Sequence, residues 1–176
     1  MKLFGPLAQA VVLAGVIASA GVVPAFAGPA ETAALEKYLG TWNGTGTMTG
    51  GQTQSVTCKM ALSEGNGGKL NYTGRCNLAG AQLSVTGTIA WIDAKHRYEA
   101  VMNSGVGGFK GVAVGEREGD SIVFDLKQRA NDDQGNDISI AAAVVLSDKS
   151  ISVDFHAVFN DSGEKIDAKI PFTKAA

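Results

Sequence analysis

Apolar and polar residues alternate with a period of two over most of the chain after Gly40. Such alternation is typical of strands that bury one face. In one of these stretches Leu83, Val85 and Ile89 fall on the same face. The segments with this pattern are 40–49, 52–62, 69–78, 81–92, 97–103, 109–115, 121–129, 137–146, 151–159 and 166–173. Only short turns separate them, so neighbouring strands are expected to be antiparallel.

A different period precedes the strands. Residues 28–39 have a proline at the start and an acidic residue in the first turn, which favour a helix. Leu35, Tyr38 and Leu39 then lie at helical spacing and give this segment one apolar stripe. The pattern therefore predicts a short helical lead-in, followed by a single domain over residues 40–176.

The strands share one apolar face, which must be buried, and closing the sheet also removes its exposed edges. We therefore predict an all-β fold, an antiparallel up-and-down β-barrel of about ten strands. A sandwich of two sheets is the alternative. The outward faces carry charges where lipid would lie in an outer-membrane barrel, at Lys59, Glu99, Asp125, Lys127, Asp154 and Lys169. We therefore expect no membrane span.

Residues 1–27 have the features of an export signal. Lys2 supplies a positive start, an apolar run extends from Leu7 to Val23, and Ala25-Phe26-Ala27 forms a small-x-small cleavage site. A membrane anchor is the alternative, but the cleavage motif favours a signal that is removed. No cysteine stands at its end for lipid attachment. The sequence predicts a soluble protein of the periplasm, or a secreted one.

Two cysteines, Cys58 and Cys76, follow the signal. They lie in consecutive predicted strands, and folding the chain about Gly67 places them directly opposite each other on the apolar face. Opposed positions of two strands can bring the side chains close enough for a disulfide. Paired cysteines also suit an oxidising compartment. A catalytic thiol is the alternative, but no CxxC spacing or neighbouring histidine accompanies either residue.

Amino-acid composition and net charge exclude further fold classes and partners. The chain of 176 residues contains 23 glycines and has a formal net charge of −2. Glycine at this level suits many tight turns and excludes a coiled coil or a helical bundle. A weakly acidic chain without a basic patch argues against nucleic acid as a partner.

The segment Leu39-Gly40-Thr41-Trp42 directly follows the predicted helix. It resembles the Gly-x-Trp start of the calycins, which include lipocalins, fatty-acid-binding proteins and avidins. The resemblance implies a small ligand-binding barrel in which Trp42 packs across the closed end in a structural role. The same motif, with a hairpin that carries two cysteines, also resembles small periplasmic inhibitors of secreted metalloproteases. Those inhibitors are barrels of about eight strands, and this chain is longer.

Five aromatic residues are candidates for lining the interior: Tyr72, Trp91, Tyr98, Phe124 and Phe155. Small residues are expected beside them on the inward face: Gly74, Gly87, Ala100, Ala142 and Ala157. Small inward residues leave volume, and a barrel of this size can hold one small ligand. A packed core is the alternative explanation for the aromatic residues.

The sequence contains no recognisable catalytic, metal or cofactor motif. His96 falls in a predicted turn and His156 on an outward face, and neither has a second ligand placed beside it. The acidic segment 131–137 lacks the residue order of a calcium loop and is expected to be a solvated hairpin loop. We therefore predict a protein that binds a small apolar or amphipathic ligand and is not an enzyme. The alternative is a protein-binding module of the cell envelope, such as a protease inhibitor.

Overall fold

The structure is a computed structural model that describes residues 28–78, 81–105, 109–132 and 134–176. The export signal expected over residues 1–27 lies outside this described part. One short helix precedes ten strands, as the sequence predicts. The strands are β1 (Gly40–Thr49), β2 (Gln54–Glu64), β3 (Leu70–Leu78), β4 (Ala81–Ile92), β5 (Arg97–Ser104), β6 (Lys110–Glu118), β7 (Ser121–Asn131), β8 (Asp137–Ser147), β9 (Ser150–Phe159) and β10 (Lys165–Lys174). Their bounds differ from the expected ones by a few residues at most.

The helix α1 (Gly28–Glu36) is shorter than the segment predicted for it. It ends in turns, in which the backbone N–H of Tyr38 donates to Leu35 O at 3.0 Å and that of Leu39 to Glu36 O at 3.1 Å. A three-residue 3₁₀ helix, Asp93–Lys95, lies between β4 and β5. Within the described residues, no helix has the length and apolar character needed to cross a membrane.

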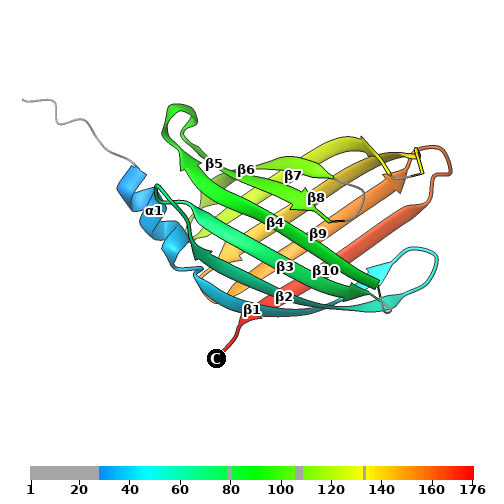
Figure 1. Ribbon diagram of the computed structural model, residues 1–176, viewed down its shortest axis with the longest axis horizontal. Helices are drawn as coiled ribbons and strands as arrows, with labels where there is room; N and C mark the ends of the chain where they lie inside the picture. Colours follow the sequence, from blue (N-terminus) through cyan, green and yellow to red (C-terminus); the bar gives the residue numbers. More distant parts are fainter. Residues whose placement is uncertain (1–27, 79–80, 106–108, 133) are drawn as a thin grey trace, which may run out of the picture.

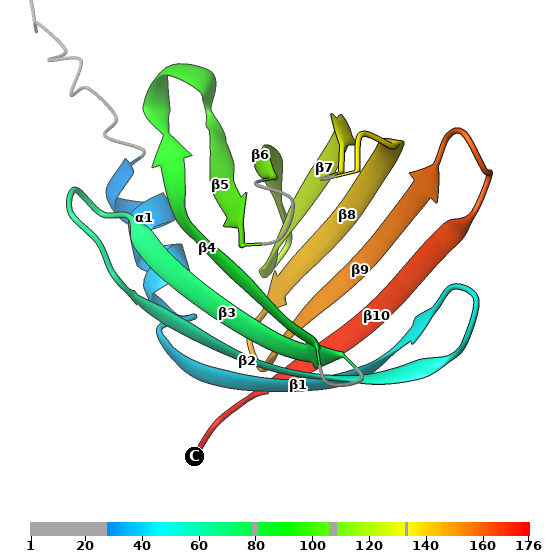
Figure 2. The same cartoon turned by 45° about the vertical axis from the view of Figure 1, so that its right-hand side comes forward.

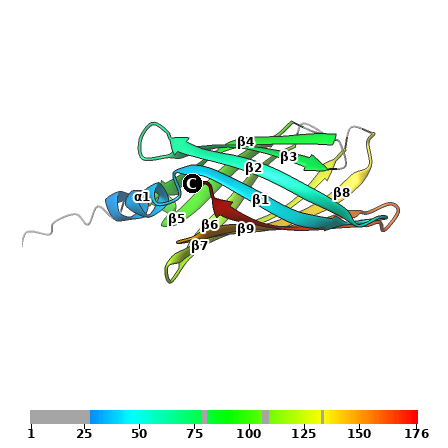
Figure 3. The ribbon, with the colours of Figure 1, turned by 90° about the horizontal axis from the view of Figure 1, so that it is seen from below.

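The ten strands form a closed antiparallel barrel in which each strand pairs with its neighbours in sequence and β1 pairs with β10 (Figure 1). The β1–β10 register sets Gly44 opposite Phe172 and Met48 opposite Ala168. The up-and-down barrel is therefore confirmed, and the two-sheet alternative is wrong. In Figure 3, β1 to β4 run along one side of the barrel, with β6, β7 and β9 along the other.

The two ends of the barrel differ in what covers them. At one end, here named the helix end, β1 starts, β10 finishes and α1 lies alongside (Figures 1 and 2). The loops β1–β2, β7–β8 and β9–β10 lie at the opposite end, here named the far end. All neighbouring strands are antiparallel, so each strand runs from one of these ends to the other. The position of a residue along its strand therefore shows at which end of the barrel it lies.

Two glycines allow backbones to approach closely within the barrel wall. A Cβ atom added to Gly46 would lie 2.0 Å from the carbonyl oxygen of Lys169, and one added to Gly87 would lie 1.9 Å from that of Val101. No other residue type fits at these distances. Glycine within a strand often marks such a close approach or bend, so part of the glycine content serves barrel closure in addition to turns.

The β2–β3 hairpin has the register expected from the sequence. Val56 lies opposite Leu78 and Met60 opposite Gly74, with Cys58 and Cys76 between them. The two cysteines form a disulfide bond. Cys58 is buried, so the bond belongs to the interior face of the barrel wall.

Candidate functional site

Interior-facing side chains at the helix end are almost completely buried. Leu35 and Tyr38 cover this end, with 0% and 2% of their surface exposed. The barrel residues packed with them are Trp42, Leu62, Leu70, Ile89, Tyr98, Ile122, Phe124, Leu146, Ile151 and Phe172. This cluster closes the helix end of the barrel with apolar side chains.

Hydrogen bonds connect the lead-in to the barrel at this closed end. The indole Nε1–H of Trp42 donates to Tyr38 O at 2.9 Å, and Tyr38 Oη–H donates to Leu146 O at 3.1 Å. Burial raises the pKa of Tyr38. Trp42 is 1% exposed, and the ammonium of Lys174 lies 5.7 Å from its ring centroid. Trp42 thus lies between the lead-in and the barrel wall.

Three of the five aromatic residues considered for ligand contact lie together at the closed end. The ring centroids of Trp91 and Tyr98 are 5.0 Å apart, and those of Tyr98 and Phe124 are 6.3 Å apart, both in edge-to-face geometry. The Tyr98 hydroxyl donates to the carboxylate of Glu31 in α1, whose other neighbour is the Arg117 guanidinium at 3.7 Å. Burial and the Glu31 carboxylate raise the pKa of Tyr98. Tyr98 and Phe124 are fully packed, so they do not line an open volume.

Tyr72 lies against the wall of the barrel. Its ring covers Gly87, where an added Cβ would be 2.5 Å from the hydroxyl oxygen, and that hydroxyl donates to Val101 O at 3.1 Å. Burial raises the pKa of Tyr72 to about 12. At Gly74, an added Cβ would lie 2.8 Å from the Val85 side chain. The volume that the sequence suggested at Gly74 and Gly87 is therefore occupied by the side chains of their neighbours.

Most interior-facing side chains at the far end are less buried than those at the helix end, although Val56 and Ala157 are buried there, with 1% and 6% of their surface exposed. The half-buried apolar residues of this end, here named the far-end apolar set, are Met48, Leu78, Leu83, Met102, Phe109, Ile138, Ile140, Phe155, Phe159 and Ile166. Phe155 is the one member that the sequence had singled out. It lies between Ala142 on β8 and Ala168 on β10, both small and half-buried. Apolar surface therefore reaches solvent at this end of the interior.

The interior positions of the far end carry no charged side chain in the part of the chain that the structure describes. Their polar members are Gln54, Ser104 and Gln128. The Gln128 amide donates to Lys110 O at 2.8 Å, which ties β7 to β6. An ionised group would meet no opposite charge at these positions, and burying an unpaired charge is costly. The inward side chains of the far end are therefore suited to contact with an uncharged molecular surface.

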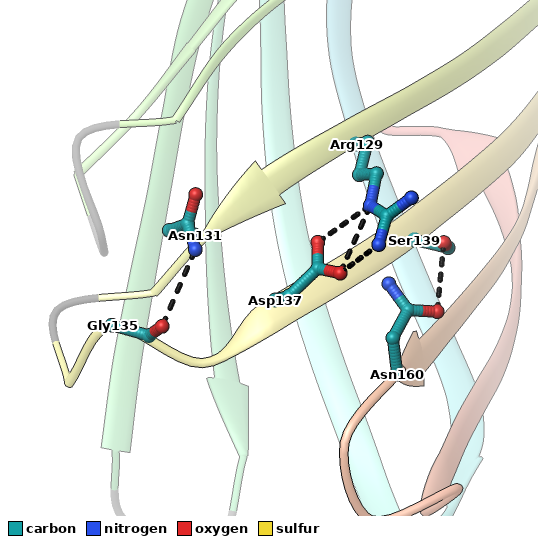
Figure 4. Close-up of polar contacts among 6 residues, drawn as sticks. All are labelled: Arg129, Asn131, Gly135, Asp137, Ser139 and Asn160. Carbon is teal, nitrogen blue, oxygen red and sulfur yellow. Dashed lines mark hydrogen bonds and ion pairs between the residues drawn. The ribbon is translucent and has the colours of Figure 1, made fainter.

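Polar contacts hold the rim of the far end between β7, β8 and β9 (Figure 4). Arg129 forms an ion pair with Asp137, its Nε lying 2.7 Å from Oδ1. The Arg129 guanidinium holds the pKa of Asp137 below its usual range. Ser139 Oγ donates to the Asn160 side-chain oxygen at 3.0 Å, and the Asn131 amide to Gly135 O at 3.3 Å. These exposed contacts link β7 to β8, and β8 to the residue that follows β9.

Neither histidine faces the interior. His96 is exposed in the turn after Asp93–Lys95, and His156 is exposed on β9, where its Nδ1 is hydrogen-bonded to the Asp167 carboxylate. In the described ranges, no three histidine, cysteine, aspartate or glutamate side chains are grouped to hold a metal ion. The site therefore consists mainly of apolar side chains with a few neutral polar ones, and the described residues form no metal-binding cluster in it.

The resemblance implied one closed end at Trp42, but the assignment of the candidate lining residues to the two ends was missed from the sequence, although a signal was present. Each hairpin reverses the chain, so counting turns from Gly40 assigns every inward residue to one end. Met102, Phe109 and Ile138 follow from this count as inward residues of the same end. Aromatic character alone selected Tyr98 and Phe124 instead, which lie at the closed end.

These observations define the protein as a closed ten-strand β-barrel with one covered end. No protein-family model matches the sequence, and no curated protein matches it either. Among solved structures, the chain is similar to Rv2717c from M. tuberculosis, with a TM-score of 0.65 at 15% identity, over 82% of this chain and 96% of that one. It is also similar to the S-type phycobiliprotein lyase CPES from Guillardia theta, with a TM-score of 0.57 at 7% identity, over 85% of this chain and 93% of that one. At these identities the likeness concerns the fold alone, and it is consistent with the calycin-like build expected from residues 39–42.

Proposed function

We propose that the protein binds one small apolar or amphipathic ligand through the far end of its barrel, without catalysing a reaction. The observation that carries this proposal is the contrast between the ends. The helix end is packed, whereas most inward apolar side chains of the far end, those of the far-end apolar set, are only partly buried. Covering apolar surface stabilises a complex by about 25 cal/mol per Å², so the far-end apolar set supplies a driving force for binding.

The lining also indicates how such a ligand lies. Its buried part must be uncharged, because the inward positions of the far end offer neutral side chains. A polar group would remain at the rim, near Arg129, Asp137 and Asn160. One barrel of similar fold is named as a phycobiliprotein lyase. That likeness supports a barrel built around a small molecule, and we propose no lyase activity for this chain.

The cellular location forms part of the same proposal. The export signal expected over residues 1–27 would direct the protein to the periplasm or to secretion. The disulfide between Cys58 and Cys76 suits such a compartment, because disulfides persist where the environment is oxidising.

The proposal is tested by titrating the protein with N-phenyl-1-naphthylamine, an uncharged apolar probe whose fluorescence rises in apolar surroundings. We expect saturable binding. Ala142→Phe should weaken it by about tenfold or more, since the larger side chain projects inward beside Phe155. Ala143→Phe is the matched control, because Ala143 lies next in β8 and faces outward between Asp125 and Asp154.

Two results would contradict ligand binding in the barrel. One is the absence of saturable probe fluorescence in the unsubstituted protein. The other is an equal loss of affinity in Ala142→Phe and Ala143→Phe while both variants keep the circular dichroism of the parent.

Docking to an envelope protein is the second candidate, and one observation favours it. Val101 and Val112 are directly opposed on the outer face of β5 and β6, with 43% and 49% of their surface exposed. Exposed apolar side chains in contact are a common element of protein interfaces. Under this alternative, a double variant with Val101→Thr and Val112→Thr would lose a partner captured from envelope extract, with unchanged probe binding.

A further inference from the structure

The outer face of β1 to β4 has an unusual composition. Its outward positions carry threonine, serine, asparagine, glutamine and a few apolar residues, and no acidic side chain. All these positions lie in the described part of the chain. Two cations, Lys59 on β2 and Arg75 on β3, are the charged residues of this face. Apart from Lys59 and Arg75, the outward side chains of these four strands are therefore uncharged.

Lys59 and Arg75 lie directly opposite each other in the β2–β3 register. Like charges that are directly opposed across two strands destabilise a sheet. Across the described residues, no carboxylate lies within ion-pair distance of either one. Some cations elsewhere on the barrel do have such partners, as Arg97 has in Glu99 and Arg129 in Asp137. The charge of this pair is therefore uncompensated within the described chain.

A hollow lies in the surface at this pair. Its volume is about 230 Å³. The lining residues are Thr57, Cys58, Lys59, Arg75, Cys76, Asn77 and Gln82. One water molecule takes a share of roughly 30 Å³ in the liquid, so the hollow has room for a group larger than a single bound water.

The disulfide beneath the hollow fixes the backbone positions of Lys59 and Arg75. Lys59 directly follows Cys58, and Arg75 directly precedes Cys76, the partner of Cys58 in the disulfide bond. The bond keeps the two strands in register, so the backbone positions of Lys59 and Arg75 remain opposed when an anion arrives. A site that needs little reorganisation loses less free energy on binding.

We propose that Lys59 and Arg75 form a binding site for an oxyanion, a phosphate, sulfate or carboxylate group carried on a small hydroxylated molecule. The Arg75 guanidinium offers paired donors that match an oxyanion, and the Lys59 ammonium adds a point charge. The hydroxyl of Thr57 and the amide of Gln82 supply neutral hydrogen-bonding groups for the carrier. This site lies on the outer face and is independent of ligand binding inside the barrel.

The experiment is an NMR titration of backbone amides at fixed ionic strength with glucose 6-phosphate, inorganic phosphate and glucose. We expect saturable shifts at residues around the hollow with both phosphates and none with glucose. Glucose 6-phosphate should bind more tightly than inorganic phosphate. Equal affinities for glucose 6-phosphate and inorganic phosphate would contradict the proposal that the oxyanion is carried on a hydroxylated molecule.

Three variants locate the site. Lys59→Gln and Arg75→Gln should each weaken glucose 6-phosphate by roughly fivefold or more, the size of one exposed ion pair. Lys127→Gln is the matched control, because Lys127 is an exposed lysine in the middle of β7, opposite Ala141, on another part of the wall. An equal effect of Lys127→Gln would overturn the proposal, since binding would then reflect general charge.

Thermal unfolding distinguishes a binding role from a structural one. Without anion, Lys59→Gln should keep or raise the Tm, because removing one charge relieves the repulsion. Added glucose 6-phosphate should raise the Tm of the unsubstituted protein and leave that of the variant unchanged. A lower Tm of Lys59→Gln without anion, together with an unchanged phosphate response, would show that the pair serves the fold.

Discussion

Trp42 illustrates how one side chain connects two parts of the chain. Its indole donates to the backbone of Tyr38 in the lead-in, while its ring is buried among residues of the closed end. The Gly-x-Trp resemblance gave it a structural role, and its surroundings explain how that role would arise.

Replacing Trp42 should therefore affect stability first. We expect Trp42→Ala to lower the free energy of unfolding by about 3–5 kcal/mol, as for other buried aromatic residues. Trp42→Phe is the control and should cost less, because it keeps most of the apolar contact and loses the hydrogen bond to Tyr38. Urea unfolding measures both, and an unchanged midpoint in Trp42→Ala would contradict a structural role.

Among the elements, the β2–β3 hairpin is the one whose geometry the sequence determines most fully. Its disulfide joins residues 18 positions apart. In the chain-entropy description, a cross-link over a loop of this size stabilises the fold by about 3 kcal/mol, because it restricts the unfolded chain.

The double replacement of Cys58 and Cys76 by alanine should lower the free energy of unfolding by about 2–4 kcal/mol. Reduction of the unsubstituted protein should produce a similar loss. Thiol titration of the unfolded, non-reduced protein should find no free thiol at these positions. Two free thiols, or equal stability of the oxidised and reduced forms, would contradict the prediction.

The strands were predictable because each depends on alternation within a few residues and on turns that set the register. Cys58 opposite Cys76 and Leu146 opposite Ile151 follow from that information alone. The packing of Gly87 under Tyr72 did not follow. It depends on side-chain directions across neighbouring strands, which a pattern of apolar positions does not contain.

At the scale of the whole molecule, three tyrosines share one property. Burial raises the pKa values of Tyr38, Tyr72 and Tyr98, that of Tyr72 to about 12. An unfolded tyrosine ionises near pH 10. Between these values the unfolded chain releases protons that the folded protein retains, so each raised pKa contributes stability below about pH 10 that is lost as the pH rises.

The free energy of unfolding should therefore fall between about pH 10 and pH 12. Tyr72→Phe should flatten this fall by about 2 kcal/mol, because one of the three groups is removed. Urea unfolding at several alkaline pH values measures the slope for both proteins. Identical slopes would contradict the assignment to Tyr72, since lysine and arginine titration is common to both.

The candidate site belongs to this scale as well, since it arises from the difference between the two ends. Sequence patterning marks Phe155 and Phe124 alike as inward aromatic residues. The structure separates them, because α1 and the lead-in cover only the end at which Phe124 lies. That asymmetry comes from where the helix docks, which involves Glu31, Arg117 and Tyr98 from distant parts of the chain.

An even number of strands returns the chain to the end at which it entered the barrel. The first residue of β1 and the last residue of β10 both lie at the helix end (Figure 1). A reporter domain or surface linker joined after Lys174 would therefore leave the far end unobstructed. The loops around the far end could be lengthened or exchanged, as in the engineering of antibody loops, without altering either point at which the chain enters or leaves the barrel.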